Sequence, residues 1–140
     1  MRYLLDTDTC SYLIDGRFVE VQHRALALPI ADLGISVITR AELRFGVELK
    51  KSNKLDRLVN RFLAEFQCLP WTARCADIHA AIRAQLQRSG SPIGGFDTLI
   101  AAHALALDVT LVTHNTRHFE KVPGLRLADW VNGLLLEGSH

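Results

Sequence analysis

The chain lacks any apolar run long enough to cross a bilayer, because even its first apolar stretch is interrupted by Asp6 and Asp8. The same interruption argues against a secretory signal peptide. Cysteine is scarce: Cys10, Cys68 and Cys75 show no Cys-x-x-Cys spacing and are too few for a disulfide framework. We therefore expect a protein without a membrane partner that works in a reducing cytoplasm.

The chain also lacks a strong excess of either charge, because its formal net charge is only +1. Any nucleic-acid partner must then be held by a local basic patch. Such a patch lies between residues 40 and 61 and consists of Arg40, Arg44, Lys50, Lys51, Lys54, Arg57 and Arg61. A solvated helical face would explain the same run of charges.

Internal repeats, low-complexity segments and inter-domain linkers are absent from the sequence as well. With 140 residues, 49% of them hydrophobic, the chain is long enough for one domain with a proper core and hardly long enough for two. We predict a single domain over residues 1–137. The ending Gly138-Ser139-His140 resembles the remnant of an expression tag and is left out of the functional reasoning.

Strands and helices are predicted to alternate along the chain. Short apolar runs predict strands over residues 1–6, 33–37, 67–71, 109–113 and 125–127. Helical spacing predicts helices over residues 7–14, 18–28, 39–50, 55–66, 73–88, 96–107 and 116–121. This alternation predicts an α/β fold with a parallel sheet and helices on both faces.

Two acids follow directly after the first predicted strand. Ligands of open parallel sheets bind beyond the carboxyl ends of the strands, where Asp6 and Asp8 lie. Either acid could instead serve only as the cap of the following helix. Asn115 and Thr116 follow a later buried strand, where they could cap a short helix or face the same crevice. Acids in apolar surroundings are costly to ionise without a compensating cation, so this pattern favours a metal-dependent hydrolase.

Glu42 is predicted to lie on or against the apolar face of the helix over residues 39–50. That face is defined by the helical spacing of Ile38, Ala41, Phe45 and Leu49. The alternative is a glutamate at the border of the face that swings out to pair with Arg44 or a neighbouring lysine.

Asp97 stands in the first turn of a helix that is apolar nearly all round and is therefore expected to be buried. An acid at a helix N-terminus gains from the helix dipole, so stability alone would explain it, although the preceding Gly94-Gly95 also lets backbone approach a ligand closely. His103 is interpreted as a hydrogen-bonded core residue of this helix, and His114 and His118 as surface residues.

Four segments of the chain resemble the signature blocks of PIN-domain ribonucleases, most closely the VapC-type toxins. They are YLLDTD at 3–8, ITRAEL at 38–43 with Gly46 after it, FDTLIAAHA at 96–104, and VTHNTRHF at 112–119. The likeness runs from Met1 to Trp130 and includes the ending PGLRLADW at 123–130. The resemblance implies a PIN-like three-layer α/β/α sandwich with a short central parallel sheet.

The resemblance also implies an Mg²⁺- or Mn²⁺-dependent endoribonuclease that acts as the toxin of a type II toxin–antitoxin system. Its implied partners are RNA, with transfer RNA as the expected class, a cognate VapB-type antitoxin and a second copy in a homodimer. By the same resemblance, Asp6, Glu42 and Asp97 are the catalytic, metal-binding acids, with Asp8 and Asn115 as support. Supporting side chains are Thr7, Ser11, Thr113 and Thr116, and the candidates for contact with the RNA backbone are Arg40, Arg44, Lys50 and Lys51.

The chain departs from the family pattern at two positions. Asn115 stands where the wider family has a fourth acid, so the number of metal ions, one or two, is open. Asp8 stands where the family often has asparagine. In the implied mechanism Asp6 and Asp97 are the direct ligands of a hard cation that activates water, and Glu42 orients or deprotonates the attacking water.

Two other classes of protein stay open. The segment Asp6-Thr7-Asp8 is also similar to the nucleophile and acid of haloacid-dehalogenase phosphatases, although Cys10 replaces the expected Thr or Val and no acidic pair follows the strand ending at Thr113. The other class is a receiver-like or non-catalytic PIN-type module that binds RNA or protein without cleaving it. A receiver would need an aspartate at the end of a central strand, whereas Asp56 lies in an amphipathic helix.

Overall fold

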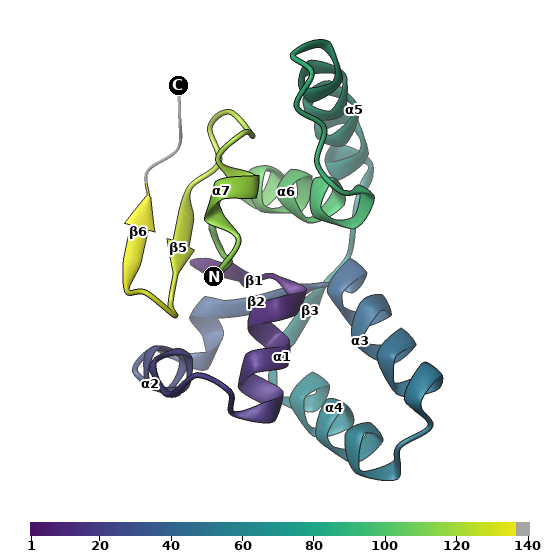
Figure 1. Cartoon of the computed structure of the whole chain (residues 1–140), viewed down its shortest axis with the longest axis vertical. Coiled ribbons are helices and arrows are strands. Elements are labelled where there is room, and N and C mark those ends of the chain that lie inside the picture. Colours follow the sequence, from purple (N-terminus) through teal and green to yellow (C-terminus); the bar gives the residue numbers. More distant parts are fainter. Residues whose placement is uncertain (137–140) are drawn as a thin grey trace.

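The computed structural model describes residues 1–136. At its centre is a sheet with the strand order β3-β2-β1-β4-β5-β6 (Figure 1). The strands are β1 (Tyr3–Leu5), β2 (Leu33–Ser36), β3 (Gln67–Leu69), β4 (Thr110–Val112), β5 (Leu127–Asp129) and β6 (Leu134–Leu136). Strands β1 to β5 are parallel, and β6 pairs antiparallel with β5. The first strand is therefore central, and its Tyr3 pairs with Leu33 on one side and Thr110 on the other.

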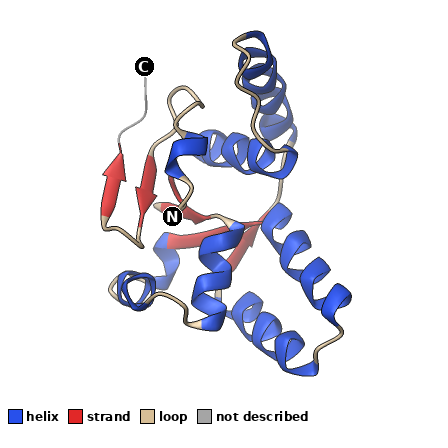
Figure 2. Ribbon diagram, viewed as in Figure 1, coloured by secondary structure: helices blue, strands red, loops and turns tan. Residues whose placement is uncertain are grey.

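Helices connect the strands and cover both faces of the sheet (Figure 2). They are α1 (Thr7–Asp15), α2 (Val19–Leu26), α3 (Val37–Lys50), α4 (Asn53–Glu65), α5 (Ala73–Arg88), α6 (Gly95–Leu107) and α7 (Thr116–Phe119). Helices α5 and α6 lie on one side of the sheet, and α1 to α4 on the other. Within the described range, 1–136, none of the helices is long and apolar enough to cross a membrane.

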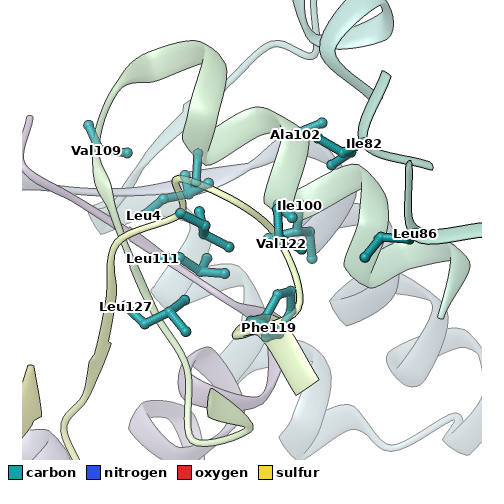
Figure 3. Packing of buried hydrophobic residues seen from close by; sticks show 13 residues of the cluster. Leu4, Ile82, Leu86, Ile100, Ala102, Val109, Leu111, Phe119, Val122 and Leu127 are labelled. Carbon is teal, nitrogen blue, oxygen red and sulfur yellow. The ribbon is translucent and has the colours of Figure 1, made fainter. Parts of the chain in front are cut away.

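Two apolar cores form on opposite faces because neighbouring side chains of a strand point in opposite directions. Leu4 packs with Ile82 of α5 and Ile100 of α6 (Figure 3). Its neighbour Leu5 belongs to the other core, with Phe62 of α4. These two cores confirm the predicted three-layer α/β/α arrangement.

Polar side chains begin several helices at the carboxyl edge of the sheet. Asp6 ends β1 and caps α1, since its carboxylate accepts a hydrogen bond from the Thr9 N–H. Ser36 ends β2 and caps α3 in the same way, accepting from the Ile38 N–H at 3.0 Å. Gly16 ends α1 in the left-handed conformation, with φ +72°. These caps fix where the functional residues after each strand lie.

The end of the chain differs from the prediction. The strand predicted at 125–127 is present but lies two residues later, at Leu127–Asp129. Leu125 is buried before it, with its N–H donating to the Val122 carbonyl. Strand β6 and the 3-10 turn Ile30–Asp32 were not expected. Helix α3 begins two residues earlier than predicted, since Ser36 already caps it. The predicted tag remnant, 138–140, lies outside the described residues.

Candidate active site

Asp6 lies at the end of the central strand, where its backbone and its side chain are both fixed. Its N–H donates to the Val112 carbonyl at 3.0 Å, and its Oδ1 accepts from the Thr9 N–H at 2.8 Å. Only 5% of the residue is exposed. Burial, with a smaller contribution from the charge of Asp8, raises the pKa of Asp6 to about 6, against hydrogen bonds from Thr113 and Thr9 that lower it. Asp6 is thus a buried acid that is costly to ionise.

Glu42 reaches the same edge from α3 and is held there by a hydroxyl. The distance from Thr7 Oγ1 to Glu42 Oε1 is 2.6 Å, and the distance from Thr7 Oγ1 to Thr39 Oγ1 is 3.1 Å. Because a hydroxyl has one proton, Thr7 donates to the carboxylate and accepts from Thr39. The pKa of Glu42 is raised by burial and by the charges of Asp97 and Asp8, whereas the Thr7 hydrogen bond lowers it.

The predicted apolar face of α3 is wrong. Its members Phe45 and Leu49 are 65% and 69% exposed, and the buried residues are Thr39, Leu43 and Val47. The prediction chose the stripe that contains Phe45 and Leu49. In the structure, the stripe that contains the small polar Thr39 faces the sheet. Glu42 follows Thr39 by three residues, so it still faces the site from the border of the buried stripe.

Asp97 lies in the first turn of α6 and contacts His118 of α7. The distance from Asp97 Oδ2 to His118 Nε2 is 3.1 Å. The Gly94 N–H lies 3.4 Å from the same nitrogen and can donate to it only when that nitrogen carries no proton. Burial raises the pKa of Asp97, the charge of His118 lowers it, and Asp8 raises it. His118 was interpreted as a surface residue; 25% of its side chain is exposed, but its pairing with a predicted metal ligand was not expected.

The supporting residues lie at the ends of β1 and β4. Thr113 is buried, hydrogen-bonds Asp6 through its side chain, and accepts from the Asn115 N–H at 3.0 Å. Asn115 is exposed before α7, which begins at Thr116. Ser11 lies one turn after Thr7 on α1 and is half-buried. His103 is fully buried with Nδ1 2.8 Å from Ser36 Oγ, which confirms its core interpretation.

The three predicted acids share one electrostatic environment. The charge of Asp8 raises the pKa of Asp6, Glu42 and Asp97, although these residues come from different elements. Each acid is also bound to its own partner, Thr9, Thr7 or His118. Over residues 1–136, no three His, Cys, Asp or Glu side chains are arranged as a ready-made metal site. The carboxylate oxygens are hard donors and nevertheless fit a cation such as Mg²⁺. That these three acids bind a metal ion stays a prediction.

The basic candidates lie at different distances from this site. Arg44 pairs with Asp56 at 2.9 Å and with Glu48 at 3.6 Å, so the alternative in which Glu42 pairs with Arg44 is wrong. Arg40 is exposed in the first turn of α3. Lys50 and Lys51 end the same helix, about 15 Å further along its axis at 1.5 Å per residue.

Sequence reasoning missed three residues of the site. Thr9, Thr39 and His118 hold Asp6, the Thr7 hydroxyl and Asp97 respectively. Two of them had a signal in the sequence: Thr9 follows the capping acid by three residues, and Thr39 precedes Glu42 by three. His118 had no such signal, because its contact depends on how α7 packs against the start of α6.

Fold and site together define an α/β protein with a carboxylate site at the carboxyl edge of a parallel sheet. The PIN domain family model matches residues 3–125. The tRNA(fMet)-specific endonuclease VapC of Shigella flexneri is 37% identical over 133 residues, which cover 93% of this chain and 98% of that protein. The chain therefore belongs to the PIN domain family. This membership confirms the family resemblance and rules out the haloacid-dehalogenase and receiver-like alternatives.

Solved structures agree with this assignment. DNA-bound VapBC from Salmonella typhimurium matches with a TM-score of 0.84 and 35% identity, covering 93% of this chain and 98% of that chain. VapBC2 from Rickettsia felis, bound to a DNA fragment from their promoter, matches with a TM-score of 0.81 and 32% identity, covering 91% and 97%. The predicted PIN-like fold is thereby confirmed.

Proposed function

We propose that this protein is a metal-dependent endoribonuclease, the toxin of a type II toxin–antitoxin pair, and that its substrate is a transfer RNA. One observation carries the proposal: Asp6, Glu42 and Asp97 lie at one edge of the sheet, and the charge of Asp8 helps to raise the pKa of all three. The names of the relatives support the reaction class, and that of the Shigella flexneri protein supports the substrate class.

Asp6 and Asp97 would hold the metal ion in this proposal. Bound Mg²⁺ or Mn²⁺ neutralises charge on the phosphate and makes a water molecule more acidic. Asp6 offers the oxygen that does not cap α1, since its Oδ1 is engaged by the Thr9 N–H. Asp97 would offer its Oδ1, since its Oδ2 contacts Nε2 of His118, and His118 would keep the carboxylate oriented.

Glu42 would take the proton from the attacking water. The Thr7 hydroxyl donates to Oε1 of Glu42 and leaves Oε2 for the water, so the carboxylate has a fixed orientation. Burial, together with repulsion from Asp97 and Asp8, raises the pKa of Glu42 and makes it a better proton acceptor than an exposed glutamate. Arg40, at the start of α3, would contact the RNA backbone.

Cleavage of initiator and elongator transfer RNAs by purified protein tests the proposal. We expect cleavage that EDTA stops and Mg²⁺ or Mn²⁺ restores, and that Asp97→Asn reduces by a factor of roughly 10³ or more. Asp77→Asn, an exposed aspartate on α5, is the matched control and should cleave normally. A folded Asp97→Asn protein with normal activity, or cleavage that ignores EDTA, would contradict the proposal. Folded wild-type protein that binds RNA without cleaving it would support the non-catalytic module instead.

The antitoxin would bind an exposed apolar surface of this chain. The structures of relatives are complexes of toxin and antitoxin, VapBC. The apolar face of α4 does not offer this surface, because its Val59, Phe62 and Leu63 are buried. Phe45 and Leu49 of α3 are the exposed alternative. Co-expression with a cognate VapB-type antitoxin should give a complex that Phe45→Glu disrupts. The homodimer stays a prediction, which analytical ultracentrifugation would test.

A further inference from the structure

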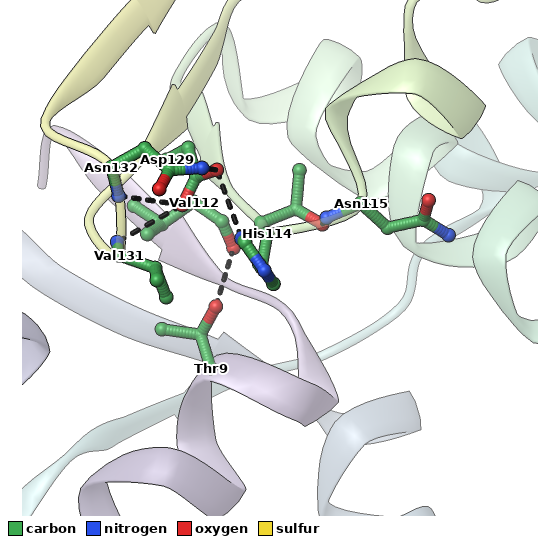
Figure 4. Close-up of polar contacts among 8 residues, drawn as sticks. Thr9, Val112, His114, Asn115, Asp129, Val131 and Asn132 are labelled. Atoms are coloured by element: carbon green, nitrogen blue, oxygen red, sulfur yellow. Dashed lines mark hydrogen bonds and ion pairs between the residues drawn. The ribbon is translucent and has the colours of Figure 1, made fainter. Parts of the chain in front are cut away.

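A buried carboxylate outside the acidic site fixes a histidine at the same edge of the sheet. Asp129 ends β5, is 2% exposed, and its Oδ2 lies 3.0 Å from Nδ1 of His114 (Figure 4). The same carboxylate accepts from the Val131 N–H at 2.9 Å and from Nδ2 of Asn132 at 3.0 Å. Because Asp129 also accepts from these two groups, it acts as an acceptor toward His114, so Nδ1 of His114 carries the proton of this hydrogen bond.

His114 lies next to the acidic site. It follows Thr113, whose side chain hydrogen-bonds Asp6, and it stands at the end of β4, which pairs with β1. The Thr9 hydroxyl donates to the Val112 carbonyl at 3.2 Å and ties α1 to the same strand (Figure 4). The expectation of a surface histidine is right about exposure, since 40% of the side chain is accessible, but the ring is held in place.

Aromatic rings surround the fixed imidazole. The ring centroid of Tyr12 lies 6.4 Å from that of His114, and the centroid of Phe18 lies 6.0 Å from it. The guanidinium of Arg17 stands over the Tyr12 ring, 5.2 Å from its centroid, and is 59% exposed. An exposed ring among aromatic side chains, with a cation beside it, is the arrangement that binds single-stranded nucleic acid by stacking.

We propose that His114 is the stacking platform for an unpaired RNA base next to the scissile phosphate, with Asp129 as its positioning residue. This inference rests on the proposed ribonuclease function and names how the substrate is recognised. An imidazole already fixed by Asp129 loses little freedom when a base stacks on it, so the contact is favourable.

RNA binding can be measured without cleavage in an Asp97→Asn background. The probe is a fluorescently labelled transfer-RNA anticodon stem-loop in Mg²⁺, and the readout is fluorescence anisotropy. We expect His114→Ala to weaken binding roughly 5- to 150-fold, from the range for one stacked base. His114→Phe, which keeps a ring, should recover most of the affinity. His23→Ala, an exposed histidine on α2, is the matched control and should bind normally.

Abasic nucleotides placed one at a time in the loop separate stacking from a loss of fold. At one loop position, an abasic nucleotide should weaken RNA binding by the Asp97→Asn protein. The same nucleotide should not affect RNA binding by His114→Ala in that background, because the abasic site and the mutation remove the same contact. Asp129→Asn should raise KM more than it lowers kcat in the cleavage-competent protein. Circular dichroism checks that each variant is folded.

Three results would overturn the inference while leaving the ribonuclease function intact. The first is that His114→Ala binds RNA as tightly as the Asp97→Asn protein without it. The second is that abasic nucleotides still weaken RNA binding by His114→Ala. The third is that His114→Phe weakens RNA binding as much as His114→Ala does. Weaker antitoxin binding with unchanged RNA affinity would also overturn it and assign this surface to the antitoxin. Failure of the ribonuclease function itself would be recognised separately, because the wild-type protein would then cleave no RNA.

Discussion

Asp6→Asn should stabilise the metal-free protein at neutral pH. The difference between the ordinary pKa of 3.8 and the value of about 6 in the folded protein corresponds to a cost of about 3 kcal/mol for ionised Asp6. Asparagine caps a helix as well as aspartate does, so the bond from the Thr9 N–H survives. The new amide group faces Thr113, which offsets the gain by about 1 kcal/mol. The expected net gain in free energy of unfolding is about 2 kcal/mol at pH 7.5.

The sign of the pH dependence follows from the raised pKa. Below about pH 4, Asp6 is protonated in the folded and the unfolded chain, and it costs nothing. Between about pH 4 and 6 the unfolded chain ionises first, so the stability of the wild type falls as pH rises. Above about pH 6 the whole cost is present. The advantage of Asp6→Asn should therefore shrink by about 2 kcal/mol between pH 7.5 and pH 4.5.

Thermal melting followed by circular dichroism in EDTA measures this effect. A gain of about 2 kcal/mol should raise the Tm by roughly 4–8 °C at pH 7.5. Asp77→Asn is the matched control, because it removes an exposed carboxylate and should shift the Tm by less than about 2 °C. The reasoning is refuted if Asp6→Asn melts with the wild type at pH 7.5, or if its advantage is the same at both pH values.

Three further predictions concern the same site. Mg²⁺ should raise the Tm of the wild type and not that of Asp6→Asn, as measured by melting with and without the ion; equal shifts would place the cation elsewhere. Thr7→Val should lower kcat roughly tenfold or more in a transfer RNA cleavage assay, because Glu42 loses its orienting hydrogen bond, whereas Thr7→Ser should keep the activity. Arg40→Ala should reduce the slope of log Kd against log salt by about one, and Lys51→Ala, about 15 Å further along α3, should leave it unchanged. Identical slopes for these two variants would contradict the placement of RNA near Arg40.

The alternation of elements and the positions of the acids could be predicted from the sequence. A strand followed by Asp6 and a helix with Asp97 in its first turn are local patterns, and both are observed. The rotation of α3 about its axis could not be predicted in this way. Phe45 and Leu49 are the larger apolar residues, but burial depends on which stripe meets the sheet, and Thr39 lies on that stripe.

Contacts between distant segments were beyond the reach of local patterns. His118 meets Asp97 only because α7 packs beside the start of α6, and His114 meets Asp129 because β4 and β5 are neighbours in the sheet. A histidine near an acid in space carries no mark in the sequence. Strand β6 was missed for a related reason, since it exists through its antiparallel pairing with β5.

The central place of the first strand has a consequence for protein synthesis. Tyr3 pairs with Thr110, so the middle of the sheet closes only after about four-fifths of the chain has left the ribosome. Asp97 also arrives late, and Asp6 needs the Val112 carbonyl to hold its backbone. The nascent chain therefore has no assembled active site. The ribosome that makes it is not exposed to a working nuclease until translation is nearly finished.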